Sequence, residues 1–385
     1  MRTGAAPRHS SQADPLGVRE DFPVTAEGIY LDSAYITPPP ASVVEAGARF
    51  LKSKARKPIS LGHMLARTNE VRDKFARLVG VSSEEIGFLY ATTEGENVVA
   101  RQIGFEHGDN VVVDELHYST TYILYKHLEE TNGIELRVAR QRDGAVPVSE
   151  FERLVDARTR LISVAWVSHQ NGFRHDMKAL GALAHAHDAY LYTDAVQAVG
   201  MFPVNLGETG IDFLATGTYK WLLAGYGLAP FFVRRELLDR VRPDRVGALQ
   251  VEEELGNYRY RLYKGARVFE YATLAFDAVY QLGAALDYLT QVGLERIGKH
   301  TMALAQQLRS GLVERGFRVL TPPNNDSSIV SFVHGGDPET VRGIMEQNEI
   351  QVSFREDGTQ IRVGIALFNN AAEIDRLLEV AERLG

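Results

Sequence analysis

The chain has 385 residues, of which 45% are hydrophobic and 24% are charged, and its formal net charge is −8 at pH 7. This balance is typical of a globular enzyme with one large and one smaller domain, and it disfavours nucleic-acid binding through a basic face. No apolar run is long enough to span a bilayer, so no membrane partner is expected.

The sequence contains no cysteine. Disulfides, thiolate metal sites and persulfide chemistry on a thiol of the enzyme itself are therefore excluded, and no metal site is expected. The lack of disulfides fits a cytoplasmic location. Residues 1–15 contain arginine but no apolar h-region, so no secretory signal is expected there. A polar tail is the preferred interpretation, and a transit peptide is the alternative.

The first third of the chain predicts a short strand and turn at 29–40, helices at 41–54 and 67–79, and a strand that ends at Ala91. The next residues, T-T-E-G-E-N, begin a helical pattern. A helix N-terminus offers free N–H groups and a positive dipole end, which suits a phosphate, and Thr92 and Thr93 add hydroxyl groups. The alternative for these threonines is a plain N-cap.

Two further strands are each followed by polar residues. His117 lies between the strand that begins at Asn110 and the next helix, where a histidine can shuttle protons or simply cap the helix. The apolar run LISVAWV predicts a strand of the parallel sheet, and the loop at its end holds His169, Gln170 and Asn171. Strands that alternate with helices in this way favour a βαβ architecture.

The central stretch, residues 189–233, contains two short apolar runs that predict buried parallel strands, one ending at Asp194 and the other leading through a turn to Lys220. Open α/β sheets place their chemistry at such strand ends, so the carboxylate and the amine are expected to face one crevice. Pyridoxal phosphate needs a lysine for a Schiff base and a carboxylate beside its ring nitrogen. Gln197 is a candidate to bind the ring's phenolic oxygen. A lone aspartate or a lone lysine in such a position is more often structural, so Asp194 and Lys220 are informative only as a pair.

The last third predicts a helix from residue 234 to Pro243, a Gly-, Tyr- and Arg-rich region at 247–268, and a long helix at 274–292. Helices and strands then alternate through short loops to the end of the chain. This order predicts a smaller α+β domain.

Several motifs together resemble the class V aminotransferase family of fold-type I pyridoxal-phosphate enzymes, which also includes cysteine desulfurases and isopenicillin N epimerase. They are D-x-x-Q, T-G-T-Y-K-W-L-L, T-T-E-x-x-N, R-V-F-E-Y-A-T and F-N-N-x-x-E-I-D, and the resemblance covers about residues 28–380. It implies an α/β fold with a mostly parallel central sheet, helices on both faces and a smaller α+β C-terminal domain. The expected divisions are a tail or small-domain segment at 1–28, a large cofactor-binding domain at 29–285 and a small domain at 286–385.

The resemblance also implies roles for individual residues. Lys220, His117 and Asp194 are the implied catalytic residues, and the ring of His117 is expected to stack on the cofactor. The substrate is expected to meet Tyr35, Asn171 and the guanidinium of Arg362, which suits an α-carboxylate. The implied cofactor-binding residues are Thr92, Thr93, Glu94 (with the backbone of Gly95), His117, Asn171 (or Gln170), Asp194, Gln197, Thr218, Lys220 and Thr273.

Thr273 corresponds to a threonine that reaches the phosphate bound by the neighbouring subunit, so the resemblance implies a homodimer. Ala272 stands where the family usually has glycine. A buried structural threonine is the alternative.

The expected function is that of a pyridoxal-phosphate enzyme that acts on an amino acid through a Schiff base on Lys220. Aminotransferase activity ranks first because it needs no further residue type, and a C–S (β) lyase or an epimerase is the alternative. The absence of cysteine disfavours a cysteine desulfurase of the usual kind. A catalytically silent homologue is disfavoured by the presence of Lys220 and Asp194, and a dehydrogenase by the lack of G-x-G-x-x-G after a first strand.

Overall fold

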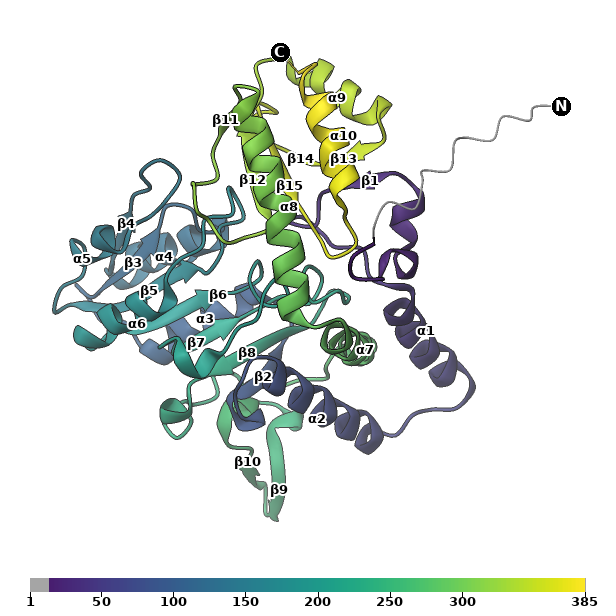
Figure 1. Ribbon diagram of the computed structural model, residues 1–385. Helices are drawn as coiled ribbons and strands as arrows, with labels where there is room; N and C mark the ends of the chain where they lie inside the picture. The colour runs from purple at the N-terminus through teal and green to yellow at the C-terminus, as the bar shows by residue number, and fades with distance from the viewer. Residues whose placement is uncertain (1–13, 385) are drawn as a thin grey trace.

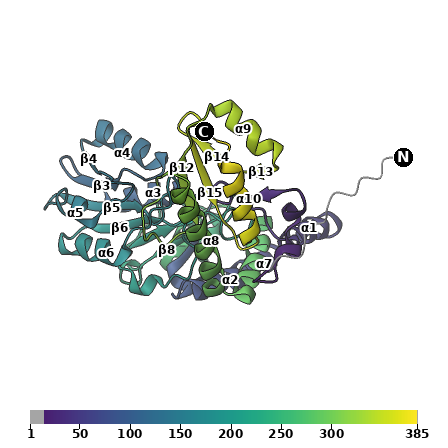
Figure 2. The same ribbon diagram turned by 45° about the horizontal axis from the view of Figure 1, so that its top comes forward.

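The computed structural model describes residues 14–384, and residues 1–13 of the expected tail lie outside the described part. A seven-stranded sheet with helices on both sides forms the larger part of the molecule, and a four-stranded sheet with its own helices forms the smaller part (Figure 1). Figure 2 shows the long helix α8 (Leu294–Glu314) running between the two parts.

The large sheet has the strand order β2-β8-β7-β6-β5-β3-β4. Only β8 runs antiparallel to its neighbours, so the predicted mostly parallel sheet is confirmed. Because β2 and β7 both run opposite to β8, the carboxyl ends of every strand except β8 lie at one edge. The strands are β2 (Ile86–Leu89), β3 (Asn110–Asp114), β4 (Glu135–Ala139), β5 (Thr159–Ala165), β6 (Tyr190–Asp194), β7 (Phe213–Ala215) and β8 (Ala229–Val233).

Alternate residues of these strands enter two cores on opposite faces of the sheet, as the pleat requires. Val112 packs into the core that contains residues of α5, α6 and α7, whereas Val111 and Val113 pack into the core that contains residues of α3 and α4. The predicted helices on both faces are therefore confirmed. The helices of this part are α1 (Ala41–Arg56), α2 (Leu61–Leu78), α3 (Thr92–Ile103), α4 (Ser119–Asn132), α5 (Val148–Glu152), α6 (Met177–Ala186) and α7 (Phe276–Val292).

The smaller part is built on an antiparallel sheet of order β11-β12-β15-β14. A separate parallel pair joins β1 to β13, and Leu31 packs into the core of this part. Helix α8 contributes Ile297 to the large core and Leu308 to the small one, so it spans both. The elements are β1 (Ile29–Tyr30), β11 (Arg318–Val319), β12 (Ile329–Val333), α9 (Pro338–Gln347), β13 (Ile350–Gln351), β14 (Ser353–Arg355), β15 (Gln360–Gly364) and α10 (Ala371–Ala381).

Two local predictions differ from the structure, and one region for which no element was predicted forms a hairpin. Helix α2 begins at Leu61, earlier than the predicted residue 67, because Ser60 accepts a hydrogen bond from the backbone of His63 and caps it. The predicted helix that ends at Pro243 is reduced to one 3-10 turn, Arg235–Leu237. The polar region at 247–268 contains the antiparallel hairpin of β9 (Val251–Gly256) and β10 (Arg259–Leu262), which projects from the molecule in Figure 1. No helix within residues 14–384 combines the length and the apolar character needed to cross a bilayer.

Candidate active site

A cavity of about 490 Å³ opens at the edge where the parallel strands end. Its walls come from the ends of β2, β5, β6 and β7, from the N-termini of α3 and α4, and from the β14–β15 pair of the smaller part. The polar and aromatic residues that line it are Tyr35, Tyr90, Thr92, Thr93, Glu96, Tyr118, Thr120, Thr121, His169, Tyr192, Asp194, Gln197, Tyr219, Lys220, Tyr226, Arg355 and Arg362.

Asp194 and Lys220 both line this cavity, as the sequence predicted. Burial raises the pKa of Asp194, although the nearby His117 and a backbone N–H from Val196 at 2.9 Å favour its charged form. Burial, together with the charge of Arg362, lowers the pKa of Lys220 to about 8. A lysine with a pKa of about 8 is neutral in about a tenth of the molecules at pH 7, a far larger fraction than for an unperturbed lysine, and the neutral amine is the nucleophile.

Gln197 holds the segments around these two residues together. Its Nε2 donates to the carbonyl of Ala34 at 2.8 Å, and its Oε1 accepts the indole N–H of Trp221 at 2.7 Å. At Gly200 a side chain has no room, because a Cβ would lie 2.3 Å from the carbonyl oxygen of Trp221. Gln197 faces the cavity, but both ends of its amide already have partners in the protein.

The N-terminus of α3 forms another wall. Thr92 and Thr93 line the cavity, and the hydroxyl of Thr93 lies 3.5 Å from that of Thr120 at the start of α4. Gly95 lets the helix approach β7, since a Cβ there would lie 2.7 Å from the Cβ of Ala215. The side chain of Glu94 turns away to accept the backbone N–H of Tyr90, so only backbone groups at this position remain for a phosphate.

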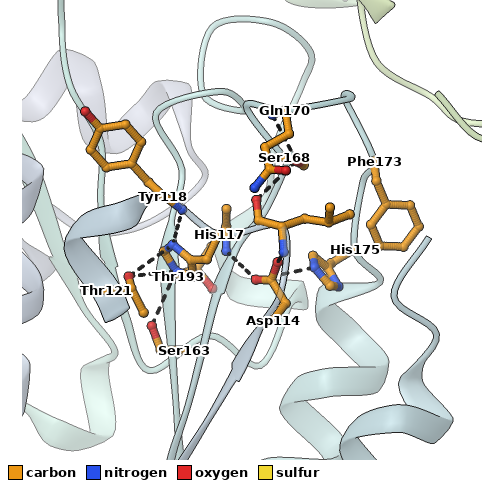
Figure 3. A network of polar contacts seen from close by, with 12 residues as sticks. Asp114, His117, Tyr118, Thr121, Ser163, Ser168, Gln170, Phe173, His175 and Thr193 are labelled. Carbon is orange, nitrogen blue, oxygen red and sulfur yellow. Dashed lines mark hydrogen bonds and ion pairs between the residues drawn. The ribbon is translucent and has the colours of Figure 1, made fainter. Parts of the chain in front are cut away.

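His117 is buried and does not line the cavity. Its neighbour Tyr118 does line the cavity. Figure 3 shows the ring among hydroxyl groups. Its Nδ1 lies 3.0 Å from Thr121 Oγ1 and accepts the backbone N–H of Tyr118, and its Nε2 lies 3.4 Å from Ser163 Oγ. Stacking of His117 on a cofactor ring stays a prediction.

Glu96 is a site residue that the sequence analysis treated only as part of a motif. Its buried carboxylate accepts from Ser163 Oγ at 2.6 Å and from Thr121 Oγ1 at 2.7 Å. Burial raises the pKa of Glu96. The two hydroxyls that bind it are the same two that border the ring of His117, so the carboxyl and the imidazole belong to one network. The only sequence signal was an acid one turn into a predicted phosphate-binding helix.

The loop after β5 places a different residue in the cavity from the one expected. Asn171 does not line it, because its amide donates to the carbonyls of Gly144 at 2.7 Å and Leu320 at 3.2 Å. Gln170 and Asn171 border a neighbouring cavity instead. His169 is the loop residue that reaches the site. Burial and the charges of two arginines lower the pKa of His169 to about 3, so its ring is neutral.

The smaller part of the molecule supplies Arg362. Its Nη1 donates to the carbonyl of His169 at 2.7 Å and its Nη2 to Ser353 Oγ at 2.8 Å, while Asp32 lies 3.7 Å away. Burial lowers the pKa of Arg362 to about 10, and the guanidinium remains charged at neutral pH. Tyr35, which is 59% exposed, lies at the rim, as expected of an entrance residue.

Besides Glu94, His117 and Asn171, two further expected cofactor-binding residues lie outside the cavity lining. Thr218 is fully buried, and its hydroxyl donates to the carbonyls of Gly225 and Leu228, so it stabilises the turn around Lys220. Thr273 is exposed, and its carbonyl accepts the hydroxyl of Tyr90 at 2.9 Å. Thr273 is therefore next to a cavity-lining residue but does not line the cavity of its own chain, which is compatible with the predicted contact to the site of a second subunit.

The donor set in this cavity fits pyridoxal phosphate. It combines an amine of lowered pKa and a buried carboxylate with a helix N-terminus flanked by hydroxyl groups. A cavity of about 490 Å³ is of a size that accommodates a cofactor and a small substrate. Fold and site together define a fold-type I pyridoxal-phosphate enzyme.

The chain belongs to the class V aminotransferase family, whose model matches residues 29–377. A probable cysteine desulfurase of Methanothermobacter thermautotrophicus is 30% identical over 96% of this chain and 97% of its own length. A cysteine desulfurase of Klebsiella pneumoniae is 28% identical over 95% of this chain and 97% of its own length. Among solved structures, the cysteine desulfurase of Thermococcus onnurineus superposes with a TM-score of 0.87 at 28% identity over 97% of this chain and 98% of that one.

A cystine C-S lyase, C-DES, has the same fold, with a TM-score of 0.88 at 19% identity over 94% of this chain and all of that one. The predicted family, fold class and cofactor are thus confirmed.

Proposed function

We propose that this protein is a pyridoxal-phosphate-dependent C–S lyase that releases a sulfur group from an amino acid without using a thiol of its own. One observation carries the proposal: a chain 30% identical to a probable cysteine desulfurase over nearly its whole length contains no cysteine. A protein without cysteine has no thiol to accept sulfur, so the sulfur must leave as a free product.

Aminotransferase activity, which ranked first from the sequence, is less well supported. The similar proteins are named as cysteine desulfurases, which cleave a C–S bond, and this favours the lyase alternative. Nothing in the cavity contradicts transamination, and the choice between the two rests on the relatives.

The residues of the cavity have separable tasks in such an elimination. Arg362 binds the α-carboxylate of the substrate. Lys220, as a neutral amine, takes the proton from Cα. Bound pyridoxal phosphate supplies an electron sink for the carbon that has lost this proton, and Asp194 is the residue that would hold its ring nitrogen protonated.

The bond changes balance without an oxidant. The Cα–H bond breaks, a Cα–Cβ double bond forms, and the Cβ–S bond breaks with its electron pair on sulfur. Hydrolysis of the resulting enamine uses one water, so the products are pyruvate, ammonia and a thiol. Lys220 holds the proton that the departing thiolate needs.

The holoenzyme incubated with L-cysteine or L-cystine tests the proposal. We expect pyruvate and released sulfur species in equal amounts, and no product from the Lys220→Ala variant. Formation of a sulfur-containing keto acid, with amino-group transfer to an added acceptor and no sulfur release, would establish transamination instead.

A further inference from the structure

We propose that Arg355 selects substrates whose sulfur substituent carries a second anionic group, so that the site takes cysteine S-conjugates with an acidic leaving group. This inference rests on the proposed lyase function. Arg355 lines the active-site cavity and also borders the neighbouring one, and the elimination described above gives it no task.

The register of the small sheet places Arg355 beside Arg362. In the antiparallel pair of β14 and β15, Ser353 lies opposite Arg362, and Arg355 lies two residues further along the same strand. Residues two apart on a strand share a face, and diagonal neighbours of this kind lie about 7–8 Å apart. Two guanidinium groups therefore reach the cavity from one face of one sheet.

His169 contacts both of these cations. Its carbonyl accepts from Arg362, and its ring Nε2 lies 3.3 Å from Nη2 of Arg355. A neutral imidazole can accept that bond, whereas a charged one would repel both arginines. The wall thus presents two fixed donor groups with an uncharged spacer between them.

The surroundings of the two arginines differ in one respect. Arg362 has Asp32 at 3.7 Å, and Ser353 bridges the two side chains. Within residues 14–384, the only side-chain hydrogen bond of Arg355 goes to His169, and no carboxylate pairs with it. The remaining donors of this guanidinium are free for an anion, and a planar guanidinium binds a carboxylate through two bonds.

When Arg362 binds the α-carboxylate of the substrate, Arg355 is left to bind the group that is attached to the sulfur atom. S-carboxymethyl-L-cysteine has such a carboxylate, and its carbamoylmethyl analogue has a neutral amide of nearly the same shape. Elimination from the acid with one water gives pyruvate, ammonia and mercaptoacetate, so the two substrates differ only in the charge on the leaving thiol.

The experiment compares kcat/KM for the acid and the amide in the wild-type holoenzyme and in Arg355→Gln. We expect the wild type to prefer the acid over the amide by about tenfold to a hundredfold, the range of one charge-assisted contact, and we expect the ratio of the two kcat/KM values to fall to about one in Arg355→Gln. Arg355→Lys should keep part of the preference. Arg318→Gln is the matched control, because Arg318 borders only the neighbouring cavity. Equal turnover of acid and amide by the wild type would overturn the inference and leave the lyase function intact.

A binding measurement separates the two hypotheses. The visible absorption of the holoenzyme is titrated with L-2-aminoadipate and with its 6-amide, which have CH2 in place of the sulfur and differ from each other in the same way as the two substrates. Tighter binding of aminoadipate that is lost in Arg355→Gln supports the acidic subsite even if no sulfur substrate is turned over, in which case only the lyase function fails. Equal binding of both ligands, together with equal turnover, refutes the subsite.

Discussion

Trp221 donates its indole N–H to Oε1 of Gln197 over 2.7 Å, and this bond joins the turn that carries Lys220 to the turn that carries Asp194. Both side chains are 4% exposed, so water does not compete for the bond. The position of the Lys220 amine relative to the Asp194 carboxylate therefore depends on a bond between two neighbouring residues, Trp221 and Gln197.

We predict that Trp221→Phe lowers both stability and cofactor affinity. The substitution leaves the buried Oε1 of Gln197 without a donor, which costs about 1–3 kcal/mol, and it loosens the turn next to Lys220. Urea unfolding and a titration with pyridoxal phosphate measure the two effects. Trp166→Phe is the control, because that buried indole packs against Phe202 and does not join the two turns. Equal cofactor affinity in both variants would contradict the role of the bond.

We predict that the rate at which the cofactor-free protein captures pyridoxal phosphate rises as the pH rises through about 8. Only the neutral amine attacks, and the pKa of Lys220 is lowered to about 8 by burial and then by the charge of Arg362. Arg362→Gln should move the midpoint to higher pH, whereas the remote Arg318→Gln should not. Stopped-flow absorbance follows the capture, and a midpoint that stays near 10.5 in the wild type would show that the amine is not perturbed.

Glu96 should make stability depend on pH. Burial raises its pKa above the ordinary 4.5, so the native state binds this proton more tightly than the unfolded state does. The stability from this group is then full below pH 4.5 and is lost as the pH rises through the folded pKa. Urea unfolding between pH 4.5 and 8 should show a smaller loss in Glu96→Gln than in the wild type.

Ser163→Ala provides the control for Glu96. The Ser163 hydroxyl favours the ionised carboxylate, so its removal is expected to steepen the loss of stability with pH. An unchanged slope in Glu96→Gln would mean that another group causes the pH dependence.

We propose, as the family resemblance implies, that Thr273 acts in the site of a second subunit, and this predicts complementation. Lys220→Ala and Thr273→Val are each expected to be impaired. A mixed dimer has one site with Lys220 from one chain and Thr273 from the other, so mixing the two proteins under conditions of subunit exchange should restore activity. If Thr273 serves its own chain, or if the protein is a monomer by analytical ultracentrifugation, mixing restores nothing.

The parts of the site that the sequence predicted are those with local signals. Asp194 ends one apolar strand and Lys220 follows another after a short turn, and strand ends of a parallel sheet meet at one edge whatever the details of packing. The Thr92–Thr93 pair begins a helix, which is again a local pattern. Arg362 was predicted from the family resemblance of the motif F-N-N-x-x-E-I-D, which lies just after it in a continuous stretch of strand and capped helix.

The parts that the sequence missed depend on tertiary contacts. Asn171 and His169 lie in one irregular loop, where no periodicity says which side chain points inward, and the contact of Asn171 with the carbonyl of Leu320 joins residues far apart in the chain. Arg355 gains its position from the pairing of β14 with β15. Thr218 lies two residues before Lys220, but its hydroxyl donates to a backbone carbonyl of the same turn and does not face the cavity.

The pairing of β1 with β13 has a consequence for how the protein is made. Residues 29–30 leave the ribosome about 320 residues before their partners at 350–351. A nascent chain can assemble the sheet that carries Asp194 and Lys220 while β1 still exposes an unpaired strand edge, which is prone to association with other chains. Arg355 and Arg362 are synthesised after Asp194 and Lys220, so the part of the cavity that contains the two arginines is completed after the part that contains the carboxylate and the amine.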